Sequence, residues 1–301
     1  MRIIKLVYIN NRKFYIIGAI FVILNYLRHG IFGYKTPRTF SINQIDRSID
    51  YDFSVVNNWV NYFKKYTSEE NSLRNKVVLE IGPGPDLGTG LILLAMGVKK
   101  YIALDVNKLI GNHIEFYEKL LEKINERYSG CNVEYLKEQV DKCIQGKGEM
   151  INYIVDKYFE ISKIRENIDI IFSHAAFEHL TNVGKTFMDL NNVVSGGILI
   201  SLIDFRTHTS WIRDKDPLNI YRYSDFFWNV FKFKGSPNKI RAYEYKELLE
   251  KNGWHNIQIE PLVVLNDEYL EKVKPSLNKK FKNLDSSEMR MLGIMLMATK
   301  K

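Results

Sequence analysis

The chain has 301 residues, enough for one large domain with extensions or for two small ones. Hydrophobic residues make up 46% and charged residues 26%, as in ordinary soluble proteins, and the formal net charge of +8 favours an anionic partner such as a membrane surface, nucleic acid or an acidic substrate. Two cysteines, Cys131 and Cys143, with no C-x-x-C motif, give neither a zinc site nor a disulfide framework and suit a reducing compartment.

The first 33 residues differ from the rest in composition. An apolar run at 14–27, interrupted only by Gly18 and Asn25, lies between basic residues. The run is shorter than the roughly 20 apolar residues of a membrane span, and no small-residue cleavage site of a secretory signal follows it. Two interpretations stay open: a helix docked on the rest of the protein, or a helix lying in a membrane interface.

The next segments predict a nucleotide cradle. Residues 49–66 carry apolar side chains at helical spacing, whereas 77–81 reads as a buried strand that ends at Gly82. Gly82 and Gly84 allow a tight turn and a close approach of backbone N–H groups to a ligand. Apolar residues then resume at helical spacing over 87–96, so that a strand, a glycine turn and a helix follow one another.

The glycine spacing indicates which nucleotide binds. A dinucleotide fingerprint has the form G-x-G-x-x-G, but Gly82, Gly84 and Gly88 form a loop that is one residue too long. Glu80 precedes the first glycine by two residues, and the strand at 101–104 ends on Asp105, which is placed to accept hydrogen bonds from a ribose diol.

The later segments alternate between helical and extended patterns. Residues 274–288 are polar and predict an exposed excursion, while 205–236 is rich in aromatic, His and Arg residues without a clear period. The expected helices are 109–128, 134–144, 183–193 and 243–252, and the expected strands are 151–155, 168–173, 198–203, 256–265 and 291–299.

Four motifs in this order resemble the class I S-adenosylmethionine (SAM)-dependent methyltransferases. They are Glu-x-Gly-x-Gly at 80–84, the strand-end Asp105, DIIFSHAAFEHL at 169–180 and GGILISLID at 196–204. The resemblance implies a doubly wound, Rossmann-like α/β sheet of seven strands in the order 3-2-1-4-5-7-6, the last strand antiparallel. It also implies SAM as cofactor and, because SAM is found there, a cytoplasmic location. We expect an N-terminal helical extension at 1–66 and a methyltransferase domain at 67–301 with a substrate-binding insertion at about 205–242.

The resemblance also implies a set of cofactor-binding residues. Asp156 would meet the adenine amino group at the end of the third strand, although it could instead cap the helix that follows. Tyr51 or Phe53, ahead of the first strand, could contact the cofactor or simply pack in the core. The cofactor-binding set is Glu80, Ile81, Gly82, Pro83, Gly84, Asp105, Val106, Asp156, Ser173 and His174.

A methyl group on a sulfonium is already electrophilic, so the protein must align the acceptor and, for a hydroxyl, remove a proton. We expect His208, oriented by Asp204 or another carboxylate, to be the base, while His174 and His179 shape the cleft. Some relatives build a metal site from Glu-x-x-Glu-His, but Ala175 replaces the first Glu here, and no metal is expected. The candidate catalytic residues are His174, Glu178, His179, Asp204 and His208.

The composition of the insertion at about 205–242 indicates which kind of molecule accepts the methyl group. Arginines interleaved with aromatic residues suit a sugar or phosphate, and 216–225 with 237–241 resembles more loosely bacterial methyltransferases linked to cell-surface glycans. We therefore expect O-methylation of a small-molecule or glycan acceptor, anionic or sugar-like, by direct in-line transfer. Nucleic acid is not expected because there is no dense basic run. Peripheral contact of residues 1–33 with the inner membrane face belongs to the second of the two interpretations left open above. The alternatives are a nicotinamide-dependent dehydrogenase and a non-catalytic SAM-fold binding module. The arginines are Arg206, Arg213, Arg222 and Arg241.

Overall fold

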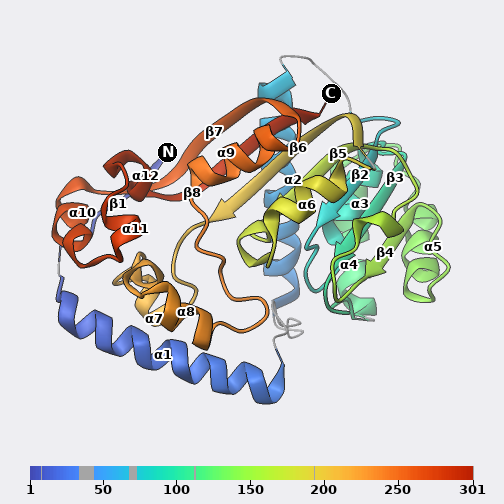
Figure 1. Ribbon diagram of the computed structural model, residues 1–301. Coiled ribbons are helices and arrows are strands. Elements are labelled where there is room, and N and C mark those ends of the chain that lie inside the picture. The colour runs from blue at the N-terminus through green and yellow to red at the C-terminus, as the bar shows by residue number, and fades with distance from the viewer. Residues whose placement is uncertain (8, 34–43, 68–72, 112, 193, 301) are drawn as a thin grey trace.

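A computed structural model describes the whole chain except residues 8, 34–43, 68–72, 112, 193 and 301. Its centre is a mixed sheet in the order β1-β7-β8-β6-β5-β2-β3-β4, in which β8 alone runs antiparallel to its neighbours (Figure 1). The strands are β1 (Arg2–Ile4), β2 (Val77–Ile81), β3 (Lys100–Asp105), β4 (Ile151–Val155), β5 (Ile168–His174), β6 (Val194–Asp204), β7 (Trp254–Leu265) and β8 (Met291–Lys300).

The predicted seven-stranded sheet is wrong in the number of its strands. An eighth strand, β1, pairs in parallel with β7, with Arg2 opposite Val263 and Ile4 opposite Leu265. The strand order therefore differs from the predicted one at this edge. Three residues are too few to show a periodic pattern, and β1 forms because β7 would otherwise present an open edge of backbone N–H and C=O groups.

Helices cover both faces of the sheet because successive strand residues point to opposite faces. Val78, Phe172 and Ile200 pack under one helical layer, whereas Leu79 and Leu199 pack under the other. The first layer holds α2 (Ile45–Thr67), α3 (Gly88–Ala95), α4 (Ile114–Arg127) and α5 (Val133–Ile144). The second holds α6 (Val183–Leu190) and α9 (Ala242–Lys251), with the 3₁₀ turns η2 (Ile161–Lys163) and η3 (Phe177–His179) nearby.

The predicted helices occur with shifted ends. The helix expected from residue 109 begins at Ile114, because the preceding turn is tied to β4: Tyr153 donates its hydroxyl proton to the carbonyl of Asn107 and accepts the N–H of Leu109. The helix expected to end at residue 193 ends at Leu190, and residue 193 itself lies outside the described residues.

A third cluster joins the insertion to the C-terminal region. Buried residues of the insertion, such as Tyr223 and Trp228, pack with Leu277 and Phe281 of the polar segment 274–288 and with Met289 directly after it. This excursion from the sheet is therefore anchored by apolar contacts. The elements of this region are α7 (Ser210–Arg213), η4 (Asn219–Arg222), α8 (Asp225–Phe231), α10 (Asp267–Val273), η5 (Lys274–Ser276), α11 (Lys279–Lys282) and α12 (Ser286–Arg290).

The N-terminal helix α1 (Asn11–Phe32) lies along α7 and α8 at the edge of the molecule (Figure 1). By contrast, α2 belongs to the central core, where the Trp59 ring stacks on Phe172 with 4.8 Å between centroids. The predicted division between an extension at 1–66 and a domain at 67–301 stays a prediction, and residues 68–72 at its boundary lie outside the described residues.

Candidate active site

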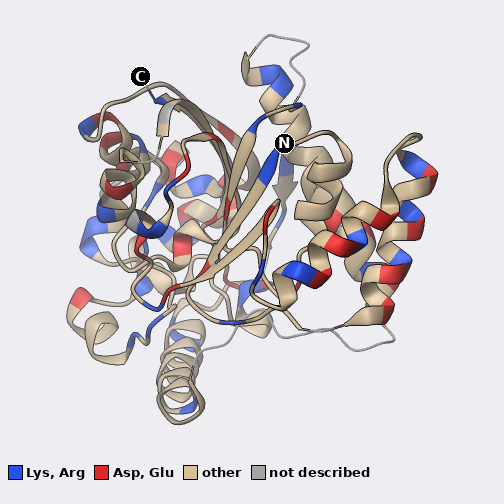
Figure 2. Ribbon diagram, turned by 90° about the vertical axis from the view of Figure 1, so that its right-hand side faces the viewer, with Lys and Arg blue, Asp and Glu red and all other residues tan. Residues whose placement is uncertain are grey.

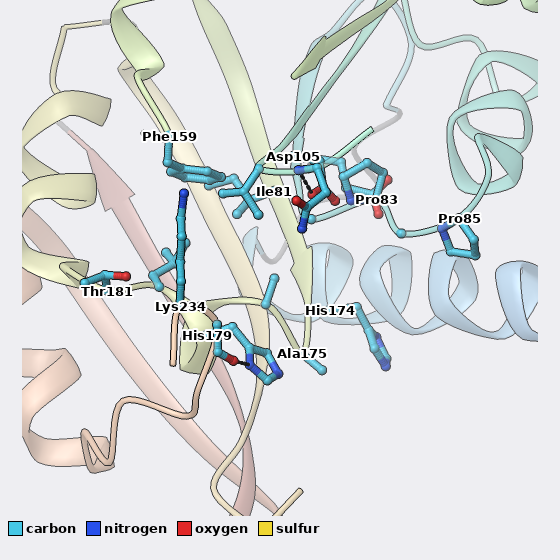
Figure 3. A pocket seen from close by; sticks show the side chains of 18 of the residues that line it. Ile81, Pro83, Pro85, Asp105, Phe159, His174, Ala175, His179, Thr181 and Lys234 are labelled. Carbon is cyan, nitrogen blue, oxygen red and sulfur yellow. Dashed lines mark hydrogen bonds between the residues drawn. The ribbon is translucent and has the colours of Figure 1, made fainter. Parts of the chain in front are cut away.

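A cavity of about 890 Å³ lies at the carboxyl ends of β2, β3 and β5. Its walls are the glycine turn, the loop after β5, the segment after β4 and residues of the insertion, and His29 and Gly33 line it at the end of α1. In Figure 3, Asp105, Ile81 and Pro83 group on one wall, with Phe159 and Lys234 on another. The carboxyl ends of strands where the sheet order reverses are the usual ligand site of such folds, and this volume is ample for a nucleotide-sized ligand.

The glycine turn requires its glycines. Gly82 and Gly84 have φ values of +75° and +86°, a region that side-chain-bearing residues rarely adopt. A Cβ on Gly82 would lie 2.6 Å from the Cβ of Ala176, so the turn after β2 and the loop after β5 approach as closely as their backbones allow. Of the predicted cofactor-binding residues, Glu80, Ile81, Gly82, Pro83, Gly84, Asp105, Val106 and His174 line the cavity.

Four buried carboxylates line the cavity beside this turn: Glu80, Asp105, Asp52 and Asp86. Burial raises the pKa of Glu80 to about 7 and that of Asp105 to about 6, and the pKa values of Asp52 and Asp86 are also raised chiefly by burial. The described groups that perturb these four pKa values are other carboxylates, hydroxyls and backbone N–H groups rather than lysine or arginine. Such a cluster would be stabilised by a bound cation.

The carboxylates are held in place by the surrounding core. Glu80 Oε2 accepts hydrogen bonds from Thr89 Oγ1 at 2.6 Å and from the Tyr101 hydroxyl at 2.5 Å. Asp105 Oδ1 accepts the N–H of Asn107 at 2.9 Å. Asp52 and Asp86 were not among the predicted site residues. Asp52 occupies a buried position on α2, and Asp86 accepts the N–H of Gly88 at 2.8 Å.

The contact of Asp156 with the adenine stays a prediction, and its carboxylate is engaged within the chain. Its carboxylate accepts the N–H groups of Tyr158 at 2.8 Å and Glu160 at 3.2 Å and pairs with Lys163, which lowers its pKa to about 2. Asp156 does not line the cavity, and the three residues that follow it, including Phe159, do. The carboxylate therefore stabilises the turn after β4. It does not cap a helix, because the next helical element, η2, begins only at Ile161.

The contact of Ser173 with the cofactor also stays a prediction, and the hydroxyl and the carbonyl of this residue are both bonded within the chain. Its buried hydroxyl donates to the carbonyl of Ile81 at 3.0 Å, and its own carbonyl accepts from the Trp59 indole at 3.3 Å. These bonds tie β5 to β2 and to α2. The cavity wall begins one residue later, at His174.

Three histidines of the candidate catalytic set line the cavity in two places. His174 packs edge-on against Tyr51 with 5.7 Å between ring centroids, apart from His179 (Figure 3). His179 and His208 lie together, with 4.6 Å between centroids, and His179 Nδ1 is 2.6 Å from the carbonyl of Gly235. Burial lowers the pKa of His174 and of His208 to about 4, so both imidazoles are neutral near pH 7.

Of the two alternatives for the group that orients His208, Asp204 or another carboxylate, the second has the closer geometry. Asp204 lines the cavity, but Arg206 holds both of its oxygens, with Nε 2.8 Å from Oδ1 and a terminal nitrogen 2.6 Å from Oδ2. Glu178 is the carboxylate beside His208, with 3.9 Å between Oε1 and Nε2. Glu178 is buried behind the cavity wall, and the same oxygen accepts the N–H of Asp204 at 3.3 Å.

Glu178, His179 and His208 also form a group that could hold a metal ion. One potential ligand atom from each lies within 4.8 Å of the others. Carboxylate and neutral imidazole are common ligands of divalent transition metals. The expected absence of a metal therefore stays a prediction, which dialysis against EDTA would test.

The arginines predicted for acceptor binding serve mainly as structural groups. Arg222 forms a buried ion pair with Asp216 at 2.7 Å, and Arg241 donates to the carbonyl of Met291 at 2.7 Å. Only Arg213 of the four lines the cavity, where it is joined by Lys157, Lys185 and Lys234. The cavity is therefore acidic near the glycine turn. Its other walls carry these cationic side chains together with Asp204 and with Asp189, which pairs with Lys185.

No family model and no curated protein matches the chain. Among solved structures, it is similar to a SAM-dependent methyltransferase from Aquifex aeolicus, with 14% identity and a TM-score of 0.41, covering 87% of this chain and 100% of that one. A candidate sarcosine dimethylglycine methyltransferase from Galdieria sulphuraria has 15% identity and a TM-score of 0.43, covering 91% and 97%. A SAM-dependent methyltransferase from Mesorhizobium loti has 13% identity and a TM-score of 0.40, covering 79% and 96%. Identities and scores this low carry no argument about function, which has to come from the site itself.

Proposed function

We propose that the chain is a SAM-dependent methyltransferase that methylates an oxygen atom of a small-molecule or glycan acceptor. The observation that carries this proposal is the cluster of Glu80, Asp86, Asp52 and Asp105 around the glycine turn. SAM carries a positive sulfonium and a positive ammonium, whereas a nicotinamide dinucleotide carries a negatively charged pyrophosphate. Buried carboxylates attract the first ligand and repel the second.

The residues on the cavity wall fit the parts of SAM. Asp105 would accept hydrogen bonds from the ribose hydroxyls, as strand-end acids do in nucleotide-binding folds. Gly82 and Gly84 leave the backbone open to the methionyl part, and Val106 and Phe159 offer an apolar wall to the adenine. When bound, SAM supplies an electrophilic methyl group, and the protein supplies alignment and proton removal.

We assign the removal of the acceptor proton to His208. Its ring lines the cavity and is neutral, so that it can accept a proton from a hydroxyl acceptor. Nε2 lies 3.9 Å from Glu178, which would then face the imidazolium that forms. We therefore assign the orienting role to Glu178, as the other carboxylate that was expected beside Asp204.

The cationic walls support an anionic acceptor such as a phosphorylated or acidic sugar. Arg213, Lys157, Lys185 and Lys234 come from four separate segments and line the same cavity. Such side chains bind phosphate and carboxylate groups by charge-assisted hydrogen bonds. We place the reaction in the cytoplasm because SAM is found there.

The test is methyl transfer from SAM labelled on its methyl group to a panel of neutral, phosphorylated and carboxylated sugars. We expect a labelled product that survives mild base, as a methyl ether does, with one S-adenosylhomocysteine released per methyl transferred. Asp105→Ala should lower the rate by weakening SAM binding. Binding of SAM without transfer to any member of the panel or to a cell extract would contradict catalysis. A base-labile methyl ester would contradict the assignment to a hydroxyl oxygen.

A further inference from the structure

The outer face of α1 is apolar although no described part of the protein covers it. Ile16, Ile20, Leu24, Leu27 and Ile31 are 50%, 51%, 52%, 51% and 74% exposed. Steps of three and four residues place these side chains in one stripe along the helix. We call this stripe, together with Phe32 at its end, the apolar ridge. A surface helix of a soluble protein normally turns polar residues outward, so the apolar ridge requires a partner.

The opposite face of α1 is held on the insertion by specific contacts. A Cβ on Gly18 would lie 2.0 Å from Asn219 Oδ1 and 2.2 Å from the Tyr223 hydroxyl, so the glycine lets the helix backbone approach closely. Asn25 Nδ2 donates to Thr209 Oγ1 at 3.1 Å farther along the helix. Before the helix, β1 is part of the sheet. The helix is therefore fixed lengthwise against the protein.

These contacts limit how α1 can meet a bilayer. The most apolar 18 residues of α1 have a mean hydropathy of 1.5, and only 11% of them are buried in the protein. By length and composition alone, α1 could therefore cross a membrane. A spanning helix, however, is surrounded by lipid or by other spanning segments. One face of α1 instead packs against a polar insertion that includes the buried ion pair of Asp216 and Arg222. The remaining arrangement is a helix in the plane of the interface, with only the apolar ridge in the lipid.

The charge around the apolar ridge indicates the kind of bilayer. Residues 1–45 contain seven Lys and Arg and no Asp or Glu. Arg12 and Lys13 lie before the ridge and Arg28 lies near its end, all three exposed. Figure 2 looks along α1 at the lower edge of the molecule, where the helix carries blue but no red positions. Cationic residues that flank an apolar stripe favour anionic headgroups.

A tryptophan lies beside the same helix. Trp211 is 42% exposed, contacts Phe21 of α1 with 6.1 Å between centroids, and has Lys215 Nζ 4.0 Å from its own ring centroid. Tryptophan is enriched at the level of lipid headgroups, where one part of the ring is apolar and the other is wet.

We propose that the apolar ridge docks on an anionic bilayer with α1 in the plane of the interface, and that this docking holds one end of the active-site cavity at the membrane surface. The link is the C-terminal end of α1, where His29 and Gly33 line the cavity. The His29 ring packs on Phe233 with 4.4 Å between centroids, and Phe233 and Lys234 line the cavity too. The second part rests on the proposed function, because it gives the membrane contact a use in presenting the acceptor.

The test is co-sedimentation of the full-length protein with vesicles of 70% phosphatidylcholine and 30% phosphatidylglycerol. The variant Ile16→Glu/Ile20→Glu/Leu24→Glu places charge on the apolar ridge. The matched control Ile114→Glu/Tyr135→Glu/Met188→Glu changes three apolar residues of α4, α5 and α6 that are also exposed, at 61%, 40% and 54%. We expect the wild type and the control to bind, and the ridge variant to bind at least tenfold more weakly. Pure phosphatidylcholine should bind the wild type more weakly.

Two further readouts test orientation. Vesicles with brominated acyl chains should quench tryptophan fluorescence in the wild type but much less in Trp211→Phe, because Trp59, Trp228 and Trp254 are buried. An environment-sensitive dye on Lys234→Cys, in a Cys131→Ser background, should brighten when vesicles are added to the wild-type ridge but not to the ridge variant.

Equal vesicle binding by the ridge variant and the wild type, or no binding by the wild type, would overturn the docking. A wild-type dimer that the ridge variant converts to a monomer in sedimentation velocity would assign the apolar ridge to a second copy of the chain. Vesicle binding with an unresponsive dye would overturn the placement of the cavity. If the wild type does not bind SAM, the proposed function is contradicted, and the result on docking is unaffected.

Discussion

Asp105 and Asp156 follow the same pattern in the sequence, an acid at the end of a strand, but we expect opposite effects from their substitution. Asp105→Asn removes a buried charge from the cavity wall. The loss of a hydrogen bond from a ribose hydroxyl to a charged acceptor is worth about 1.5–3 kcal/mol, so SAM affinity should fall about 10- to 150-fold. The protein without ligand should not be destabilised at pH 7.5, because the pKa of Asp105 is raised from 3.8 to about 6 and its ionisation opposes folding.

The sign and size follow from linkage. A carboxyl whose pKa is raised on folding binds protons more tightly in the native state, so its contribution to stability is present at low pH and is lost as pH rises through 6. A shift of about two pKa units corresponds to about 3 kcal/mol at most. Asp105→Asn should therefore raise the free energy of unfolding above pH 6, by less than this limit, and the gain should disappear below pH 4.

Asp156→Asn is the matched control. The pKa of Asp156 is lowered to about 2, so its charge stabilises the fold above the usual range of an aspartate and that contribution is lost as pH falls towards 2. The substitution should cost about 1 kcal/mol through its lost turn contacts and leave SAM affinity unchanged. Calorimetric titration with SAM and chemical unfolding at several pH values measure both effects. Unchanged affinity in Asp105→Asn together with weak binding in Asp156→Asn would refute this assignment of the two acids.

Four further predictions concern the glycine turn, the histidines and a metal ion. Gly82→Ala should abolish SAM binding and lower stability more than Gly146→Ala in thermal melts, because both glycines have φ of +75° but only Gly82 has an atom within 4 Å of the new Cβ; equal losses would argue against a tight turn. His208→Ala should lower single-turnover methyl transfer about 10²- to 10⁴-fold with SAM affinity retained, whereas His174→Ala should keep more activity; the reverse order would move the base to the loop after β5. Because the pKa of His208 is about 4, the wild-type rate should be level from pH 8 to about 5.5 and fall at lower pH, and a fall centred near 6.5 would contradict this base. Dialysis against EDTA should leave the rate unchanged, and a loss that Mn²⁺ or Zn²⁺ restores would assign Glu178, His179 and His208 to a metal ion.

The parts of the fold that were predictable are those fixed by local chemistry. The run at 77–81 is apolar because β2 is buried between two parallel neighbours, and Gly82 and Gly84 follow because the turn needs positive φ. The strand β1 was not predictable, because three residues show no period and their partner β7 lies more than 250 positions away. The docking of α1 was one of two open interpretations, and its contacts with Asn219 and Tyr223 come from sequence-distant side chains.

The site shows the same limit. Asp105 and Asp156 both follow a strand, and only the positions of Lys163 and of two backbone N–H groups turn Asp156 away from the cavity. Arg222 and Arg241 have the composition of an acceptor pocket, but Asp216 and the carbonyl of Met291 bind them in the interior. Asp52 could have been predicted as a site residue, because it is an acid on the buried stripe of an amphipathic helix.

We propose that buried carboxylates beside a glycine turn make this cavity selective for a cationic nucleotide. Calorimetric titration of the wild type with SAM and, separately, with NAD at pH 7.5 tests it most directly. We expect one-to-one binding of SAM with a micromolar Kd and no detectable heat with NAD. Binding of NAD with no binding of SAM would contradict it.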